Sequence, residues 1–115
     1  MRLIYKIVSA PLWRDAEAAG RFDGAPVDIE DGYIHFSTGE QVRETAERHF
    51  RGQDGLLLIS FDAENFGSKL KWEPSRGGAL FPHLYAPLDP AHAVSVDALR
   101  LRPDGHFEFP ALGAA

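Results

Sequence analysis

The chain has 115 residues, of which 44% are apolar and 25% are charged. These proportions are typical of globular proteins, so we expect a single domain over residues 1–115 and exclude disordered, collagen-like and coiled-coil classes. The chain contains no cysteine, which excludes a disulfide scaffold, a zinc finger, an iron–sulfur cluster and a thiolate nucleophile. Its net charge of -5, from 12 basic and 17 acidic residues, argues against a nucleic-acid partner.

The sequence also lacks a pattern for export or membrane insertion. Its longest run of large apolar residues is Leu56-Leu57-Leu58-Ile59. A signal peptide needs about 7–15 consecutive apolar residues and a membrane helix needs about 20. We therefore expect a cytoplasmic protein with no membrane partner.

The N-terminal third predicts one strand and one helix. Leu3–Ser9 alternates in the manner of a strand, which puts Tyr5 and Lys6 on opposite faces. The serine that ends this strand is a candidate N-cap for a helix over Pro11–Ala19. Arg21–Gly32 reads as a loop, because it contains glycine, proline and several acidic residues.

The middle of the chain predicts a strand, a helix and a buried strand. Tyr33–Ser37 is the strand, and it leads directly into the helix. Thr38 and Gln41 have the spacing of a capping box, and Gly52 ends the helix. Leu56–Asp62 is almost entirely apolar, which favours a central strand that is buried on both faces.

The last part of the chain predicts extended segments only. Leu70–Glu73 and Leu80–Tyr85 are short strand candidates. Ala93–Leu101 is expected to pair with His106–Phe109 across a turn that contains proline and glycine. Two helices near the N-terminus followed by several strands indicate an α+β fold.

The densest cluster of polar groups that could carry chemistry lies in the segment Asp31–Thr38. His35 could bind a ribose hydroxyl or transfer a proton, since an imidazole titrates near neutral pH. Ser37 or Thr38 could contact a phosphate at the junction between strand and helix. The alternative is structural: His35 could be a hydrogen-bonded core residue, and Thr38 could be a helix cap.

Two later segments add candidate site residues. Glu73 ends a strand beside a glycine-containing loop, and Arg76 could either pair with Glu73 or hold a phosphate or carboxylate. His83 and Tyr85 are two residues apart, so they share a strand face. They could bind a planar ring or simply border the core. The spacing of His35, Glu73 and His83 matches no metal-ligand pattern, so we predict no metal site.

Six segments together carry a resemblance to a known family. They are Tyr5–Ile7, Trp13, Asp31–Thr38, Gln41–Val42, Leu70–Glu73 and Phe81–Tyr85. They closely resemble a bacterial family called domain of unknown function 952, over about Arg2 to Leu101. The resemblance implies an ADP-ribosyltransferase-like fold, in which a split sheet and two N-terminal helices form an NAD cleft.

A more distant similarity points in the same direction. Tyr5-Lys6, Trp13, Ile34-His35 and Ser60-Phe61-Asp62 occur in the order that is found in RNA 2′-phosphotransferases. Those enzymes have this fold and use NAD. Lys6 stands where the similarity would place a ribose-binding histidine. A charged lysine can donate a hydrogen bond to ribose or pair with pyrophosphate, so the exchange favours nucleotide binding over NAD cleavage.

The resemblance implies an NAD- or nucleotide-binding domain with no established activity, which as an enzyme would be an ADP-ribosyl transferase. Within this reading we expect the catalytic residues to be His35, Glu73 and His83. The residue type and the context Trp72-Glu73-Pro74 alone make Glu73 the carboxylate that would stabilise an oxocarbenium-like state. The expected nucleotide-binding residues are Tyr5, Lys6, Ser37, Thr38, Arg76 and Tyr85. The alternative is a non-catalytic module of the same fold that binds a small ligand or a protein. A hydrolase that uses both His35 and His83 is a third option, and it requires the two imidazoles to lie close together.

Overall fold

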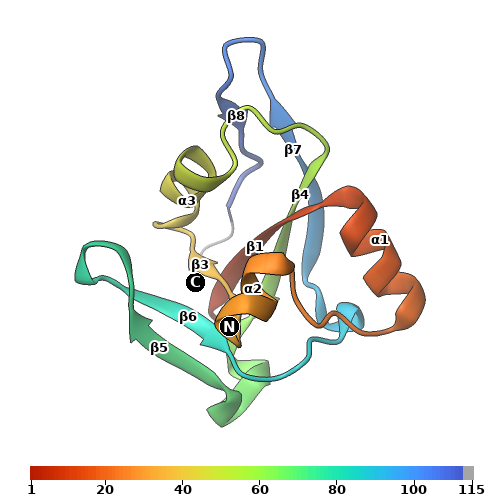
Figure 1. Cartoon of the computed structure of the whole chain (residues 1–115), viewed down its shortest axis with the longest axis vertical. Coiled ribbons are helices and arrows are strands. Elements are labelled where there is room, and N and C mark those ends of the chain that lie inside the picture. Colours follow the sequence, from red (N-terminus) through yellow and green to blue (C-terminus); the bar gives the residue numbers. More distant parts are fainter. Residues whose placement is uncertain (113–115) are drawn as a thin grey trace.

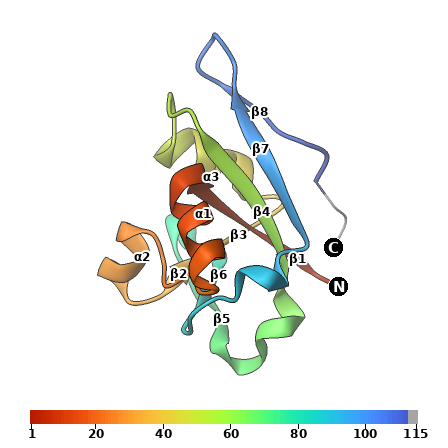
Figure 2. The ribbon, with the colours of Figure 1, turned by 90° about the vertical axis from the view of Figure 1, so that its right-hand side faces the viewer.

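The chain folds into two antiparallel sheets and three α-helices, which the computed structural model describes for residues 1–112; of Arg76 it describes only the backbone. The larger sheet has the strand order β3-β1-β4-β7-β8 (Figure 1), and the smaller has the order β2-β6-β5, with β2 labelled in Figure 2. The strands are β1 (Leu3–Ser9), β2 (Ile34–His35), β3 (Ser37–Thr38), β4 (Leu56–Asp62), β5 (Leu70–Pro74), β6 (Leu80–Leu84), β7 (Ser95–Leu101) and β8 (Phe107–Glu108). The helices are α1 (Ala10–Ala19), α2 (Pro26–Asp31) and α3 (Val42–His49), with 3₁₀ segments at Ala63–Lys69, Arg76–Gly78 and Pro90–His92.

The predicted strand β4 is confirmed and is the centre of the larger sheet. It pairs with β1 on one side and with β7 on the other, and its first six residues are buried. Helix α1 covers one face of this sheet with Trp13, and α3 covers the other face with Val42 (Figure 1). The sheet therefore separates two apolar cores, which explains why β4 is almost entirely apolar.

The segment Tyr33–Ser37 is not the continuous strand that was expected. Its first part, β2, pairs with β6 in the smaller sheet, whereas β3 pairs with β1 in the larger sheet. Between them, the N–H of Phe36 donates to the carbonyl of Pro82 at 3.0 Å. The chain therefore crosses from one sheet to the other at Phe36, and this crossing joins the two sheets.

The prediction of a loop over Arg21–Gly32 is wrong, because this segment contains α2. Pro26 occupies the first turn, where its missing N–H costs nothing. The carboxylate of Asp28 accepts a hydrogen bond from the N–H of Ala25 at 2.8 Å, which satisfies an exposed donor at the helix start. Gly32 ends the helix at a φ of 87°, a backbone conformation that favours glycine. The described residues thus form three α-helices, one more than predicted (Figure 2).

The other two helices begin close to the predicted positions. Ser9 is the N-cap residue of α1, but its side chain makes no capping hydrogen bond. Before α3, the N–H of Thr38 donates to Gln41 Oε1 at 3.1 Å, and the N–H of Gln41 donates to Thr38 Oγ1 at 3.3 Å. The reciprocal pair of Thr38 and Gln41 is therefore confirmed, but Thr38 is not the helix cap: α3 begins at Val42 with Gln41 as its N-cap residue, so the pair closes the turn before the helix. None of the helices within residues 1–112 is long and apolar enough to cross a membrane.

We predict that Trp13→Ala lowers the free energy of unfolding by about 3–5 kcal/mol, because Trp13 is fully buried against Phe22 and Phe61. Its indole N–H has no hydrogen-bond partner among the described residues. Trp13→Phe should therefore cost far less, since it removes a desolvated donor while keeping an aromatic ring. Urea denaturation of both variants tests this, and equal losses would contradict it.

Candidate functional site

A buried carboxylate organises the polar residues between the two sheets. Asp28 on α2 has no exposed side-chain surface. Its oxygens lie 2.8 and 2.9 Å from Lys6 Nζ, and they accept hydrogen bonds from the N–H groups of Ala25 and His35. Asp28 Oδ1 also lies 2.6 Å from Nδ1 of the His35 ring. One side chain thus connects β1, α2 and β2.

The partners of Asp28 keep it ionised. Burial alone would raise the pKa of this carboxyl, but the hydrogen bonds from His35 and the charge of Lys6 outweigh it and lower the pKa to about 2. Burial lowers the pKa of Lys6, and the Asp28 carboxylate acts in the opposite direction. The short distances from Nζ to both oxygens identify a buried ion pair, which is stable only while both members remain.

The backbone beside Asp28 is shaped to admit its side chain. Gly24 has a φ of 126°, and a Cβ atom at this position would lie 2.7 Å from the Cβ of Asp28. Any other residue at position 24 would therefore be strained and would also collide with Asp28.

His35 lies between two carboxylates. Its Nδ1 faces Asp28, and its Nε2 lies 2.9 Å from Oδ2 of Asp31, the last residue of α2. An ionised carboxylate can only accept a hydrogen bond, so the bond to Asp28 places a proton on Nδ1. The contact of Nε2 with Asp31 is a close approach of the two groups. Asp28 is buried, whereas the side chain of Asp31 is 43% exposed and that of His35 is 31% exposed. The Nε2 side of His35 is therefore the side that a ligand can reach.

A second histidine and carboxylate lie on the smaller sheet. Glu73 Oε1 lies 2.9 Å from Nδ1 of His83 and accepts a hydrogen bond of 2.6 Å from the hydroxyl of Tyr85. Both donors therefore lie on one face of β6 and its extension, as the two-residue spacing predicts. The hydrogen bonds from Tyr85 and His83 lower the pKa of Glu73, and the bond to Glu73 raises the pKa of Tyr85 to about 12. Glu73 is consequently an anion at neutral pH, with a side chain that is 36% exposed.

Tyr33 brings the two histidines into one group. Its ring is stacked on His83, with 4.1 Å between ring centroids and 23° between planes. The Tyr33 centroid also lies 4.7 Å from His35 and 5.2 Å from Tyr85, and the two imidazole centroids are 5.5 Å apart. Burial and the charges of Asp31 and Glu73 raise the pKa of Tyr33. We call this group the imidazole cluster; its members are Tyr33, His35, Glu73, His83 and Tyr85.

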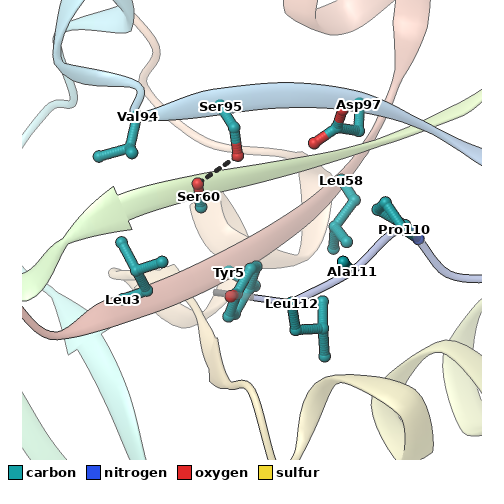
Figure 3. Close-up of a pocket in the computed structure, with 10 residues that line it drawn as sticks. All are labelled: Leu3, Tyr5, Leu58, Ser60, Val94, Ser95, Asp97, Pro110, Ala111 and Leu112. Carbon is teal, nitrogen blue, oxygen red and sulfur yellow. Dashed lines mark hydrogen bonds between the residues drawn. The ribbon is translucent and has the colours of Figure 1, made fainter. Parts of the chain in front are cut away.

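The structure therefore brings together the three residues of the predicted catalytic set, together with Tyr85. It does not bring Tyr5 to them, because Tyr5 points to the opposite face of the larger sheet from Lys6. There Tyr5 lines an apolar hollow of about 220 Å³ beside Leu3, Leu58 and Leu112 (Figure 3).

The remaining predicted binding residues bond to other parts of the fold, except Arg76, whose side chain lies outside the described residues. Ser37 Oγ lies 2.9 Å from the hydroxyl oxygen of Thr45 on α3. Thr38 forms the reciprocal pair with Gln41 described above. Lys6 is close to the imidazole cluster but reaches it only through Asp28. The side chain of Arg76 lies outside the described residues, so its predicted role remains a prediction.

Three residues at the site were not predicted: Asp28, Asp31 and Tyr33. The sequence carries a signal for the first two, since Pro26 and Gly32 bracket a short segment with the proline-start and glycine-end pattern of a helix. Lys6 within an otherwise apolar strand also signals a buried acidic partner, because a buried lysine needs one. Nothing local indicates that this partner is Asp28, which lies 22 residues away.

The chemistry available at the imidazole cluster is that of carboxylates, imidazoles and phenols. Among the described residues, no group of three or more histidine, aspartate or glutamate side chains is arranged to hold a metal ion. A hollow of about 280 Å³ lies next to the cluster and is lined by Tyr33, Asp28 and Ile29, among other residues. The site thus offers an ionised carboxylate, aromatic faces and one imidazole nitrogen on the exposed side of the cluster, where it contacts Asp31.

Comparison with known proteins supports the same family. Residues 7–96 match the model of a family described as Protein of unknown function (DUF952). The crystal structure of protein CC0527 from Caulobacter crescentus is 52% identical to this chain, with a TM-score of 0.89, and covers 92% of this chain and 93% of that one. The solution NMR structure of CC0527 is 53% identical with a TM-score of 0.83, and covers 92% and 91%. No curated protein matches the chain.

We predict that Asp28→Asn lowers the free energy of unfolding by about 3–5 kcal/mol, because it leaves the buried charge of Lys6 without its partner. Asp28 should also make the free energy of unfolding depend on pH in the acid range. Its pKa of about 2 in the folded state is below the unfolded value of 3.8, so its contribution of about 2 kcal/mol is complete above about pH 5 and is lost as the pH falls towards 2.

Denaturation of the wild type and of the double variant Lys6→Met/Asp28→Leu between pH 2 and pH 7 tests the acid dependence. The double variant should not show the part of the acid-dependent decrease in the free energy of unfolding that Asp28 causes, because it has neither charge. Identical pH profiles for the two proteins would contradict the role of Asp28.

Proposed function

The chain belongs to the DUF952 family of proteins of unknown function, and from this premise we propose that its imidazole cluster binds an NAD-type nucleotide and cleaves it as an ADP-ribosyl transferase or hydrolase does. We propose in addition that the fold is of the ADP-ribosyltransferase-like class and that the protein acts in the cytoplasm. The division into two antiparallel sheets joined at Phe36 supports the fold proposal. The geometry of Glu73 supports the chemistry.

The observation that carries the proposal is the position and ionisation of Glu73. The hydroxyl of Tyr85 and Nδ1 of His83 both contact Oε1, which fixes the carboxylate and keeps it anionic. A fixed anion stabilises positive charge that develops in a transition state, because no reorganisation is needed at the moment of reaction. Cleavage of an N-glycosidic bond develops such a charge on the ribosyl carbon, as glycoside cleavage does.

The aromatic members of the cluster fit the other part of such a ligand. The ring centroids of Tyr33 and Tyr85 lie 5.2 Å apart beside the Glu73 carboxylate. Aromatic faces next to anionic groups favour a planar cationic ring, through cation–π attraction and charge. The nicotinamide ring of NAD⁺ is planar and cationic, so it matches this part of the site.

The residues predicted to bind phosphate or ribose from β1 and β3 lie outside the imidazole cluster. Lys6 was expected to pair with pyrophosphate, but its Nζ is buried against both oxygens of Asp28. Tyr5, Ser37 and Thr38 contact other parts of the fold. We therefore assign the proposed ligand contacts to the imidazole cluster, and Arg76 remains a predicted contact.

The proposed reaction needs only NAD⁺ and water or another nucleophile. The bond between the ribosyl carbon and the nicotinamide nitrogen breaks, and nicotinamide leaves with the bonding electrons. The oxygen of water bonds to the ribosyl carbon and loses its proton to solvent. Glu73 stabilises the ribosyl cation, and His35 contacts the ligand through its Nε2 side, where Asp31 lies in this structure.

A hydrolase that uses both imidazoles is a second candidate, because the ring centroids of His35 and His83 are only 5.5 Å apart. The burial of His83 weighs against it. Its side chain is 4% exposed and lies under the ring of Tyr33. His83 is therefore placed to position Glu73 rather than to exchange protons with a substrate.

We predict that the wild-type protein releases nicotinamide from NAD⁺ and that Glu73→Gln reduces the rate at least about a hundredfold, because the neutral amide cannot stabilise the ribosyl cation. Glu47→Gln is the matched control. Glu47 also contacts a histidine, His106, at 3.1 Å, but on the surface away from the cluster. Glu47→Gln should therefore release nicotinamide at the same rate as the wild type. Chromatographic measurement of nicotinamide provides the readout.

Binding without turnover would favour the non-catalytic alternative, a module that holds a small ligand. It would appear as a thermal shift with NAD⁺ that His35→Ala abolishes. No nicotinamide release and no thermal shift with any adenine nucleotide would contradict the proposed function.

A further inference from the structure

Asp31 occupies the one position of His35 that a ligand could use. Its Oδ2 lies 2.9 Å from Nε2, the ring nitrogen that does not face Asp28. The contact joins residues four apart at the point where α2 ends and β2 begins. An anionic oxygen therefore already sits at Nε2, supplied by the chain itself.

An ammonium group, two carboxylates and an imidazole lie in a row in this part of the molecule. Lys6 pairs with Asp28, Asp28 contacts Nδ1 of His35, and Nε2 of His35 contacts Asp31. Whenever both of its ring nitrogens carry a proton, His35 is a cation between two carboxylates. Lys6 already neutralises Asp28, so in that state removal of Asp31 would leave one uncompensated positive charge on the exposed side of the ring.

The environment of Asp31 makes its contact with His35 easy to replace. Its side chain is 43% exposed, so moving the carboxylate into water costs little desolvation. It also lies at the C-terminal end of α2, where the backbone carbonyls disfavour a negative charge. Asp28, in contrast, is buried and bound from three elements, so it would stay in place.

We propose that Nε2 of His35 is an anion subsite for a phosphate oxygen, and that the carboxylate of Asp31 fills this subsite until the ligand displaces it. This subsite rests on the proposed function only in taking the imidazole cluster as the ligand site. It supplies the phosphate contact that Lys6 does not make, and gives Lys6 an indirect role: by neutralising Asp28, it leaves the charge of His35 available.

Inorganic phosphate tests the subsite without any NAD⁺ chemistry. In the full chain, Asp31→Asn should bind phosphate at least about tenfold more tightly than the wild type, because the competing internal carboxylate is gone. Glu30→Gln is the matched control: it removes one negative charge from the neighbouring, exposed position of the same helix and should leave the affinity close to that of the wild type. Chemical-shift titration of the His35 ring measures binding at the subsite itself.

The double variant Asp31→Asn/His35→Ala should lose the gain, which a general effect of charge would not cause. Equal affinities for the wild type and Asp31→Asn, or an equal gain in Glu30→Gln, would overturn the subsite. Tighter phosphate binding in Asp31→Asn without any nicotinamide release would leave the subsite standing and contradict only the proposed reaction. Nicotinamide release with no effect of Asp31→Asn on phosphate affinity would overturn the subsite and leave the proposed reaction standing.

Discussion

The buried carboxylate of Asp28 is the constraint on which the site depends. It must find donors for its oxygens inside the protein, because an unpaired buried charge would cost several kcal/mol. It finds them on three elements: Lys6 on β1, the start of α2, and His35 on β2. These contacts fix a helix of only six residues, which could not be stable alone, against both sheets. The position and ring orientation of His35 follow from the same contacts.

In both pairs of histidine and carboxylate, Nδ1 of the imidazole contacts a carboxylate oxygen, but the buried member of the pair differs. In one, the carboxylate of Asp28 is buried and the imidazole of His35 reaches the surface; in the other, the imidazole of His83 is buried and the carboxylate of Glu73 reaches it. Each buried member therefore positions an accessible one. Tyr33 packs between the two pairs and makes them a single surface. Such a surface presents an imidazole and an ionised carboxylate to the same ligand, and the carboxylate of Glu73 is the basis of the proposed function.

Periodicity predicted the regular elements well, because their residues alternate against a continuous core. Leu3–Ser9 and Leu56–Asp62 are strands with the predicted bounds, and the shared face of His83 and Tyr85 follows from the two-residue period. The crossing at Phe36 was missed for a different reason, because it depends on Pro82, a partner distant in sequence. Helix α2 does have a local signal in Pro26 and Gly32, and this signal was overlooked. The contact of Asp28 with Lys6 is again distant in sequence. A local pattern does not specify such partners, so the residues that orient His35 emerged only from the folded chain.

The measurement that tests the central claim most directly is the protonation of the His35 ring nitrogens, observed by long-range ¹H–¹⁵N NMR correlation. Because ionised Asp28 can only accept a hydrogen bond, Nδ1 of His35 must carry a proton, and its signal should change in Asp28→Asn. His106, which contacts Glu47 on the surface, serves as the reference ring in the same spectrum and should not change in that variant. A His35 ring with its only proton on Nε2 would contradict the account, since the contact with Asp28 could not then exist.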